Sequence, residues 1–427
     1  APPFFSPVPV TDRSPAPAIA TARVTRLGIA FRPRAKFPLH FERVASRRSS
    51  WSLRCYGEPR QLPGIAGVGT EPTTMDMGHG PRAGHPLITR RTCMRLSLGA
   101  LIGHGLRPGP VLAQTRPLLH IRVVHTPVLI FAPLYVAIER GYFAQQGLET
   151  ELIGTPGGAS AFAVLASGRA EAAVGGLGAA LFNAAARGLD FRVVGPAHLE
   201  RPPVSTPLVV SRTSFESGAI RRTQDLRGKR VSVNVIGSAT EFWLNAALLK
   251  AGLSITDVQM IEVNFPEVPA ALANGAIAAG MLGEPLATLA EDRGQIVRLS
   301  DDFINGVQVT AVYFSGDFMR RHTREAVGFM AAWLRACRDL SGDGYRRPDV
   351  AKIVEKYTGV PADVVTRARP PFHEPNGKMN LNDFARLQDY FKRRGLLTYD
   401  HPLLPSAYID TSFVQRALEI VGPFAPQ

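Results

Sequence analysis

The sequence contains little cysteine and no long apolar run. Its 427 residues include 3 cysteines, which are too few for a disulfide scaffold. No run of about 18 uninterrupted apolar residues is present, so we expect no membrane-spanning helix. Hydrophobic residues make up 45% of the chain and charged residues 20%. This is enough apolar material for one large core or two moderate ones.

The net charge of +14 is spread unevenly along the chain. Residues 1–113 hold 16 of the 49 Lys and Arg but only 5 of the 35 Asp and Glu, a net of +11. The remaining 33 basic and 30 acidic residues give residues 114–427 a net of +3. The body therefore lacks the basic surplus typical of nucleic-acid-binding proteins, and we expect no nucleic-acid partner. Proline follows the same division, with 15 of 35 before residue 114, so we predict residues 1–88 to be a disordered leader.

Two explanations of this leader stay open. The chain begins with Ala1, so the leader is either upstream DNA translated from a misplaced start or an organelle transit peptide, which has the same Arg-rich, Ser-rich and acid-poor composition.

Residues 89–113 resemble a twin-arginine export signal. They read TRRTCMR at 89–95, then apolar LSLGALIGHGL, then PVLA at 110–113. Cys93 stands where the pattern usually has Phe. The resemblance implies cleavage near Gln114 and a periplasmic protein that keeps Cys337 but loses Cys55 and Cys93. We therefore expect no disulfide and no metal site. Whether export uses the twin-arginine or the Sec route stays open.

Short β-branched runs alternate with Ala-rich stretches from residue 120 onward, a rhythm that predicts an α/β fold with mainly parallel sheets. A first series predicts strands at 120–126, 148–155, 171–176, 191–199 and 207–212, with helices at 132–147, 159–168 and 180–188. A second series follows the break at 211–224, with strands at 229–237, 258–264, 277–283 and 295–300 and helices at 240–252 and 268–275. We expect lobe I at 114–210 and lobe II at 211–310. A strand at 307–315 and helices, the clearest at 325–340, should return residues 311–427 to lobe I.

A set of short motifs follows in order along residues 118–425. They are PLYVA at 133–137, ERGYF at 139–143, GLE at 147–149, GG at 157–158, LASGRAE at 165–171, LRGKRV at 226–231, GS at 237–238, AGL at 251–253, ANG at 273–275 and EP at 284–285. In this order they resemble the periplasmic solute-binding proteins of the nitrate/sulfonate/taurine class of ABC importers. Glu171 stands where that family usually has Asp, and Ala278 and Ala279 stand where it has Asp-Ala. The resemblance implies a type II periplasmic-binding-protein fold, with two α/β lobes joined by two crossing strands and a ligand cleft between them.

The resemblance also implies a function, that of the extracytoplasmic substrate-binding component of an ABC importer. Such a protein captures a small organic solute by hinge closure and delivers it to a permease driven by an ATPase, which are separate chains. This chain has no G-x-x-x-x-G-K-[ST] loop of its own. We expect a monomer that meets the membrane only through the permease, with no cofactor and no enzymatic activity.

Two alternatives on the same fold stay open. One is an enzyme similar to thiamine-pyrimidine synthase, which would require a cysteine-rich iron motif and an active-site His. The sequence has no H-E-x-x-H, no G-x-S-x-G and no Cys/His cluster, and its histidines are scattered. The other alternative is a ligand-binding subunit of a sensor, in which closure would signal to a receptor.

Ligands of open α/β sheets bind beyond the carboxyl ends of the strands, where loops meet helix N-termini. Glycine there allows close backbone approach, hydroxyls donate hydrogen bonds, and free N–H groups favour an anionic or carbonyl-rich ligand. This rule selects segments 126–127, 157–160, 176–178 and 237–240. The predicted ligand-binding residues are Thr126, Pro127, Tyr135, Gly157, Gly158, Ala159, Ser160, Gly176, Leu177, Gly237, Ser238, Thr240, Asn264 and Glu284.

Several of these residues have a purely structural alternative. Ser238 and Glu241 fit a capping box, so Ser238 either only caps its helix or also contacts the ligand. The glycines at 157–158 fit an ordinary tight turn. Tyr135 and Trp243 either stack on the ligand or fill the core.

The charge of the ligand also stays open. Glu284 and Asn264 follow strands and either contact the ligand or lie at the hinge. Glu241 and Glu284 argue against a bare dianion unless they point away from the cleft. They would suit an amino or cationic group such as an aminopyrimidine, so both a sulfonate or carboxylate and a pyrimidine are candidate ligands.

Overall fold

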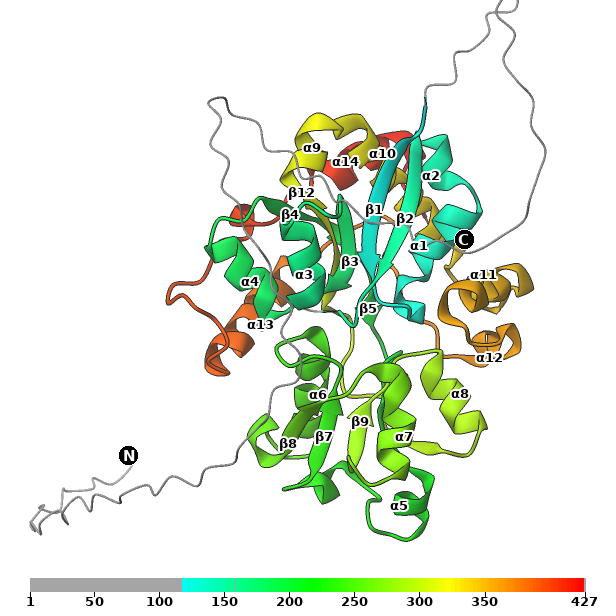
Figure 1. The fold of residues 1–427 in the computed structure, drawn as a ribbon, viewed down its shortest axis with the longest axis vertical. Coiled ribbons are helices and arrows are strands. Elements are labelled where there is room, and N and C mark those ends of the chain that lie inside the picture. The colour runs from blue at the N-terminus through cyan, green and yellow to red at the C-terminus, as the bar shows by residue number, and fades with distance from the viewer. Residues whose placement is uncertain (1–116, 158, 426–427) are drawn as a thin grey trace, which may run out of the picture. The chain divides into compact units, whose positions relative to one another are not determined.

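The computed structural model describes residues 117–157 and 159–425, whose fold is shown in Figure 1. The predicted leader at 1–88 and the predicted export signal at 89–113 lie outside the described residues, as do Cys55 and Cys93. The described part has the predicted α/β fold, with two five-stranded sheets. The prediction of mainly parallel sheets is wrong, because β12 and β6 enter the sheets antiparallel to their neighbours. Among its helices, none combines the length and the apolarity that a bilayer crossing requires.

The first sheet has the strand order β2-β1-β3-β12-β4. β1 pairs in parallel with β2 and β3, because helices return the chain to the same end between these strands. β12 arrives from the second half of the chain and pairs antiparallel with β3 and β4 in the middle of the sheet. The strands are β1 (Leu119–His125), β2 (Leu148–Gly154), β3 (Ala172–Gly176), β4 (Phe191–Pro196) and β12 (Thr310–Ser315).

The connecting helices of this sheet are short. The single helix predicted at 132–147 is two helices, α1 (Ala132–Glu139) and α2 (Tyr142–Gln145). Gly141 between them has φ 67°, a left-handed conformation that ends α1 and that glycine adopts without strain. α3 (Ala159–Ala166) follows β2, and α4 (Ala179–Ala186) follows β3.

The second sheet has the strand order β10-β6-β9-β7-β8. β7 pairs in parallel with β8 and β9, whereas β6 is antiparallel to β9 and β10. The sequence analysis groups the run at 207–212 with the first series, but the structure places it in the second sheet as β6. Its four residues are all buried, and such an apolar run does not reveal which sheet will bury it. The strands are β6 (Leu208–Ser211), β7 (Arg230–Val233), β8 (Gln259–Glu262), β9 (Ala279–Met281) and β10 (Ile296–Ser300), and the helices are α5 (Arg212–Glu216), α6 (Ala239–Lys250), α7 (Val268–Ala273) and α8 (Leu286–Asp292).

Two short strands carry the chain between the sheets. β5 (Leu199–Glu200) leaves the first sheet and β11 (Val307–Gln308) returns to it, and the two pair antiparallel with Val307 opposite Glu200. The predicted strand at 307–315 is therefore divided into β11 and β12. The two crossing strands expected from the family resemblance are confirmed.

The C-terminal part is helical, as the sequence predicts. α10 packs against α1, α2 and α14, and it buries Phe329 and Trp333 between them. α12 contacts α8, while α13 contacts α4 and β11. The tail thus contacts elements of both sheets. Its helices are α9 (Gly316–Arg321), α10 (Thr323–Asp339), α11 (Pro348–Thr358), α12 (Ala362–Arg367), α13 (Leu381–Arg393) and α14 (Ser412–Val421).

Candidate ligand-binding cleft

Two neighbouring cavities lie where strand ends of the two sheets meet. The inner cavity has a volume of about 40 Å³ and is lined by Gly157, Gly176, Ser238, Thr240, Trp243 and Thr310. The outer cavity has a volume of about 310 Å³ and is lined by Pro127, Thr155, Pro156, Asn264, Pro266 and Leu286. Because Thr126, Val128, Asn234 and Phe265 line both cavities, we treat the two as one cleft.

The carboxyl ends of parallel strands supply most of this lining. Thr126 follows β1, Thr155 follows β2, Gly176 ends β3 and Asn234 follows β7. Ser238 precedes α6 as its N-cap. The cleft is therefore at the edge of the sheets where α/β folds bind ligands.

Half of the predicted site residues line this cleft. Gly158 and the side chain of Ala159 lie outside the described residues. Tyr135, Ser160, Leu177, Gly237 and Glu284 line neither cavity. The predicted residues that do line it are Thr126, Pro127, Gly157, Gly176, Ser238, Thr240 and Asn264.

Tyr135 supports the cleft from behind. Its ring is fully buried and stacks on Tyr357 with 4.6 Å between the ring centroids. Its hydroxyl lies 3.3 Å from the carbonyl oxygen of Thr126, to which it donates, and 3.1 Å from Nδ1 of His125. Burial lowers the pKa of His125 to about 4, so this imidazole is neutral at pH 7. Tyr135 thus holds the loop after β1 without lining the cleft.

Glu284 is a structural carboxylate. It is 0% exposed and forms an ion pair with Arg298, with 2.8 Å between Oε1 and Nη1. It also accepts hydrogen bonds from the N–H and the hydroxyl of Thr288, both at 3.1 Å. Its backbone carbonyl accepts from the N–H of Leu129 at 2.8 Å. Glu284 therefore supports the segment after β1 and does not line either cavity.

Glu241 likewise binds partners outside the cleft. Its carboxylate accepts from Arg394 at 2.7 Å and from the hydroxyl of Tyr390 at 2.9 Å. Burial opposes the charge of Arg394, but the hydrogen bond to Glu241 outweighs this effect and raises the pKa of Arg394. The other oxygen of Glu241 accepts from the N–H of Gly237 at 2.7 Å.

Ser238 both caps α6 and lines the inner cavity. Its Oγ accepts from the N–H of Thr240 at 3.2 Å and donates to the carbonyl of Val235 at 2.6 Å. The predicted capping box is formed differently, because Glu241 reaches the N–H of Gly237 and not that of Ser238.

The two sides of the cleft are in direct contact in this structure. The side chain of Asn234 donates to the carbonyl of Pro156 at 2.8 Å, and the N–H of Ala179 donates to the carbonyl of Gly237, also at 2.8 Å. A Cβ at Gly178 would lie 2.5 Å from the same Gly237 oxygen. Only glycine at position 178 therefore permits this approach.

Four lining residues are not among the predicted site residues. Asn234 follows β7 and was within reach of the strand-end rule. Thr310 begins the antiparallel strand β12, so its amino end meets the cleft and the rule does not select it. For Trp243 the sequence leaves ligand stacking and core packing open, and an aromatic residue in a helix is more often core. Phe265 begins a short 3-10 turn (Phe265–Glu267), for which no signal was available.

None of the described residues that line the two cavities is Asp, Glu, Lys, Arg or His. The polar groups available to a ligand there are hydroxyls, side-chain amides, the indole of Trp243 and backbone groups. This lining suits selective binding by hydrogen bonds and apolar contact.

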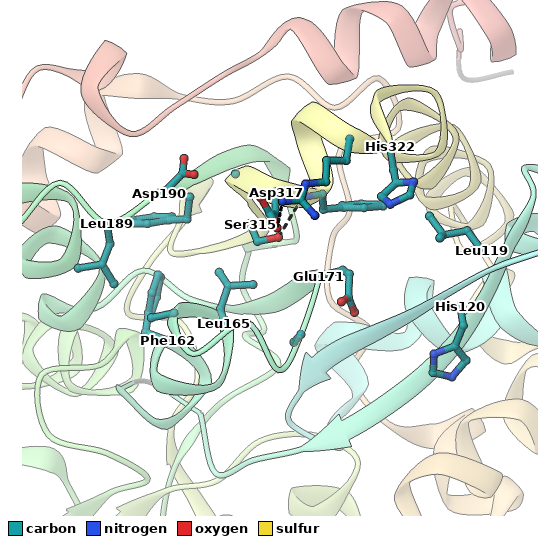
Figure 2. Close-up of a pocket in the computed structure, with 17 residues that line it drawn as sticks. Leu119, His120, Phe162, Leu165, Glu171, Leu189, Asp190, Ser315, Asp317 and His322 are labelled. Atoms are coloured by element: carbon teal, nitrogen blue, oxygen red, sulfur yellow. Dashed lines mark hydrogen bonds and ion pairs between the residues drawn. The ribbon is translucent and has the colours of Figure 1, made fainter. Parts of the chain in front are cut away.

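A larger cavity of about 400 Å³ lies at the opposite edge of the first sheet. Figure 2 shows it with Phe162 and Leu165 of α3 on the side of Leu189 and Asp190, and with His322 and His120 on the opposite side. It is lined by the amino ends of β1 and β4 and by the first turn of α9, whose N-cap Ser315 accepts from the N–H of Phe318. Its acids have partners, since Asp190 pairs with Arg320 at 2.7 Å. No described residue of the second sheet lines it, so the smaller cleft is the better candidate for a ligand site.

The architecture is the periplasmic-binding-protein fold, with two sheets, two crossing strands and a cleft between them. The family described as NMT1/THI5 like matches residues 129–343, which is half of the sequence. The chain belongs to this family.

Curated relatives match over a shorter stretch. A provisionally named binding protein of Brucella abortus is 28% identical over 162 residues, which are 36% of this chain and 50% of that protein. The chain thus spans about half the length of the curated relatives it matches.

Solved structures share the fold at low sequence identity. The alkanesulfonate-binding protein SsuA from Xanthomonas axonopodis pv. citri, bound to MOPS, is 22% identical with a TM-score of 0.58 over 69% of this chain and 99% of its own. The periplasmic nitrate-binding protein NrtA from Synechocystis PCC 6803 is 12% identical with a TM-score of 0.60 over 71% and 89%. The desulfurization enzyme DSZB is 18% identical with a TM-score of 0.53 over 72% and 100%. The fold therefore occurs in both binding proteins and an enzyme.

Proposed function

We propose that this protein is the solute-binding component of an ABC importer, which captures a small organic molecule in the cleft and delivers it to a permease driven by an ATPase. The observation that carries the proposal is a cleft lined from both sheets by uncharged polar and apolar groups, next to the crossing strands β5 and β11. A short two-stranded connection suits a hinge, and a ligand that contacts both sides favours the closed state. SsuA and NrtA, which share the fold, are named as an alkanesulfonate-binding and a nitrate-binding protein, and these names support a solute-binding role.

The proposal includes export to the periplasm, by the twin-arginine route if residues 89–113 act as the signal they resemble. It also includes a monomeric protein whose only membrane contact is through the permease. The proposal keeps the two predicted lobes as the parts that close around the ligand. It assigns β6 to lobe II, because β6 belongs to the second sheet.

The arrangement of the carboxylates favours a ligand without positive charge. Glu241 is bound to Arg394 and Glu284 to Arg298, so neither is available to an amino group in the cleft. The N-terminus of α6, with Ser238 as its cap, lies beside the inner cavity and favours oxygen-rich groups. Sulfonate-type or carboxylate-type solutes are therefore better supported than a cationic pyrimidine.

We also propose that the chain binds its ligand without transforming it. The cleft lining contains no described side chain that could serve as a general acid, base or charged nucleophile. Cys337 lies in α10, and burial raises the pKa of its thiol well above the ordinary value, so the thiol stays protonated.

Native mass spectrometry and thermal-shift assays of the purified full chain test this function. The probes are benzenesulfonate, taurine, nitrate, benzoate and 4-amino-2-methylpyrimidine. At least one should bind, and Gly176→Val should abolish that binding because its side chain occupies the inner cavity, where a Cβ already lies 3.0 Å from that of Ala239. The neighbouring Gly175→Ala is the control, since its Cβ makes only an ordinary 3.6 Å contact with Tyr313. Binding that survives Gly176→Val would place the ligand elsewhere.

A further inference from the structure

The outer cavity is lined by apolar side chains from segments that follow strands of both sheets. The segments after β1 and β2 come from the first sheet, whereas the turn after β8 and the start of α8 come from the second. A hydrocarbon group bound there would therefore join the two sides of the cleft by apolar contact. The apolar lining residues are Pro127, Val128 and Pro156 on the first side and Phe265, Pro266 and Leu286 on the second.

These apolar residues form a packed base and an exposed rim. Phe265 is 7% exposed and Val128 is 3% exposed. Their side chains approach each other at Gly283, where a Cβ would lie 3.4 Å from Cε2 of Phe265 and 3.6 Å from Cγ1 of Val128. The three prolines, in contrast, are exposed to water. A hydrocarbon group that covers this rim removes apolar surface from water, which favours binding.

The side-chain amides of the outer cavity are already bonded to the protein. Asn234 donates to the carbonyl of Pro156 at 2.8 Å and accepts from the N–H of Val235 at 2.9 Å. Asn264 donates to the carboxylate of Glu267 at 3.2 Å. Both amides keep these hydrogen bonds when a hydrocarbon group covers them, so the cost of burying them is small.

The volumes of the two cavities assign the bulk of the ligand to the outer one. The inner cavity, with about 40 Å³, is close to the share of one water molecule in the liquid, about 30 Å³. The outer cavity has about 310 Å³, and an apolar cavity of about 150 Å³ is enough to bind benzene. A ring with a substituent therefore fits the outer cavity, whereas only a small group fits the inner one.

We propose that the outer cavity is the specificity pocket of the cleft and binds an aromatic ring, so that the solute is an aryl compound. Phe265 and Leu286 are the residues that determine this specificity. Nitrate and taurine have no hydrocarbon group of this size, and the described lining offers them no charged side chain. This inference rests on the proposed function and adds the class of the solute.

Isothermal titration calorimetry of the full chain with matched probes tests the pocket. Benzenesulfonate is compared with methanesulfonate and benzoate with acetate, so the head group is constant within each pair, and nitrate and taurine are titrated beside them. The aryl member of each pair should bind at least about tenfold more tightly, because burial of a phenyl-sized group contributes a factor of about ten to a hundred. Its binding should also have the more negative change in heat capacity, which reports buried apolar surface.

Variants locate the ring in the pocket. Phe265→Ala and Leu286→Asn should each reduce the aryl preference at least about threefold in both pairs. Leu289→Asn is the matched control, since Leu289 is half-buried in the same helix α8 but lines neither cavity, and it should leave the preference unchanged. Thermal unfolding establishes that each variant is folded, and Leu286→Asn decides the question if Phe265→Ala is not.

The outcomes separate the aryl pocket from the proposed function. Equal affinities within both pairs would overturn the pocket while leaving a solute-binding cleft, as would tighter binding of nitrate or taurine than of benzenesulfonate. An aryl preference that survives in the folded pocket variants, or that falls equally in Leu289→Asn, would also overturn the pocket. If none of the six probes binds, the proposed function fails together with the pocket.

Discussion

Replacing His373 with Gln should remove part of the acid sensitivity of this protein. In the folded chain Nδ1 of His373 lies 2.6 Å from the carbonyl oxygen of Ala197, to which it donates, and Nε2 accepts from the hydroxyl of Tyr345. Both ring nitrogens are therefore satisfied in the neutral form, and a second proton would displace the Tyr345 contact. Burial, the largest cause, together with the nearby His198 lowers the pKa of His373 from 6.5 to about 3, against the opposite effect of the Ala197 hydrogen bond.

The sign of the effect follows from this depressed pKa. Between pH 3 and 6.5 the unfolded chain binds a proton that the folded chain does not, so stability is complete above about pH 6.5 and is lost as the pH falls. Between pH 7.5 and pH 5.0 one such histidine should cost about 2 kcal/mol. For any pKa of folded His373 below about 4.5, the unfolding free energy lost at pH 5.0 depends only on the pKa of His373 in the unfolded chain. His125, whose pKa burial lowers to about 4, should cost a similar amount.

The assay is urea unfolding of the full chain at pH 7.5 and pH 5.0. The quantity compared is the difference in unfolding free energy between the two pH values, which in His373→Gln should be smaller than in the wild type by about 2 kcal/mol. Replacing the exposed His401 with Gln is the matched control and should leave the difference unchanged. If His373→Gln keeps the full wild-type difference, the imidazole is not held neutral by burial and the reasoning is wrong.

Two further substitutions probe a buried ion pair and a close backbone approach at the cleft. Arg394→Met leaves the fully buried carboxylate of Glu241 without its cation and should reduce the unfolding free energy by about 3 kcal/mol, measured by urea unfolding. Gly178→Ala brings a Cβ within 2.5 Å of the carbonyl oxygen of Gly237, so the two sides can no longer approach as closely. We expect a larger radius of gyration by X-ray scattering and weaker binding of any ligand that the wild type binds.

Each of these substitutions has a matched control. Arg393→Met removes one partner of an exposed pair with Asp389 in α13 and should change the unfolding free energy by at most about 0.5 kcal/mol. A loss as large as that of Arg394→Met would mean that burial of Glu241 is not the cause. Gly175→Ala introduces no close contact, and the same scattering curve for both alanine variants would contradict the role given to Gly178.

The fold was predictable because each lobe repeats the same local signals. Alternating β-branched and Ala-rich runs predict the strands and helices of both sheets, and α10 is recognisable from its apolar face. Sheet membership was harder to predict. Nothing within residues 208–211 indicates pairing with β9 and β10, since partners in a sheet are chosen by tertiary contacts.

The candidate site was predictable only where the rule applies that ligands bind beyond the carboxyl ends of strands, next to helix N-termini. Thr126, Gly157 and Ser238 lie at strand ends or a helix start, and the structure places all three in the cleft. Thr310 enters from an antiparallel strand, so its position depends on the return of the chain from the second sheet. The side chain of Glu284 turns away because Arg298, on β10, binds it, and no local pattern encodes that partner.

The place of β12 in the middle of the first sheet has a consequence for the order of folding. All strands of the second sheet lie between residues 208 and 300, so this sheet is complete in the nascent chain before β12 has been synthesised. The first sheet begins earlier but lacks the strand that joins β3 to β4 until residues 310–315 emerge. Vectorial synthesis should therefore finish the second sheet first, although it is encoded second. A chain truncated after residue 305 would contain every strand of the second sheet, whereas β3 and β4 of the first sheet would lack the strand that joins them.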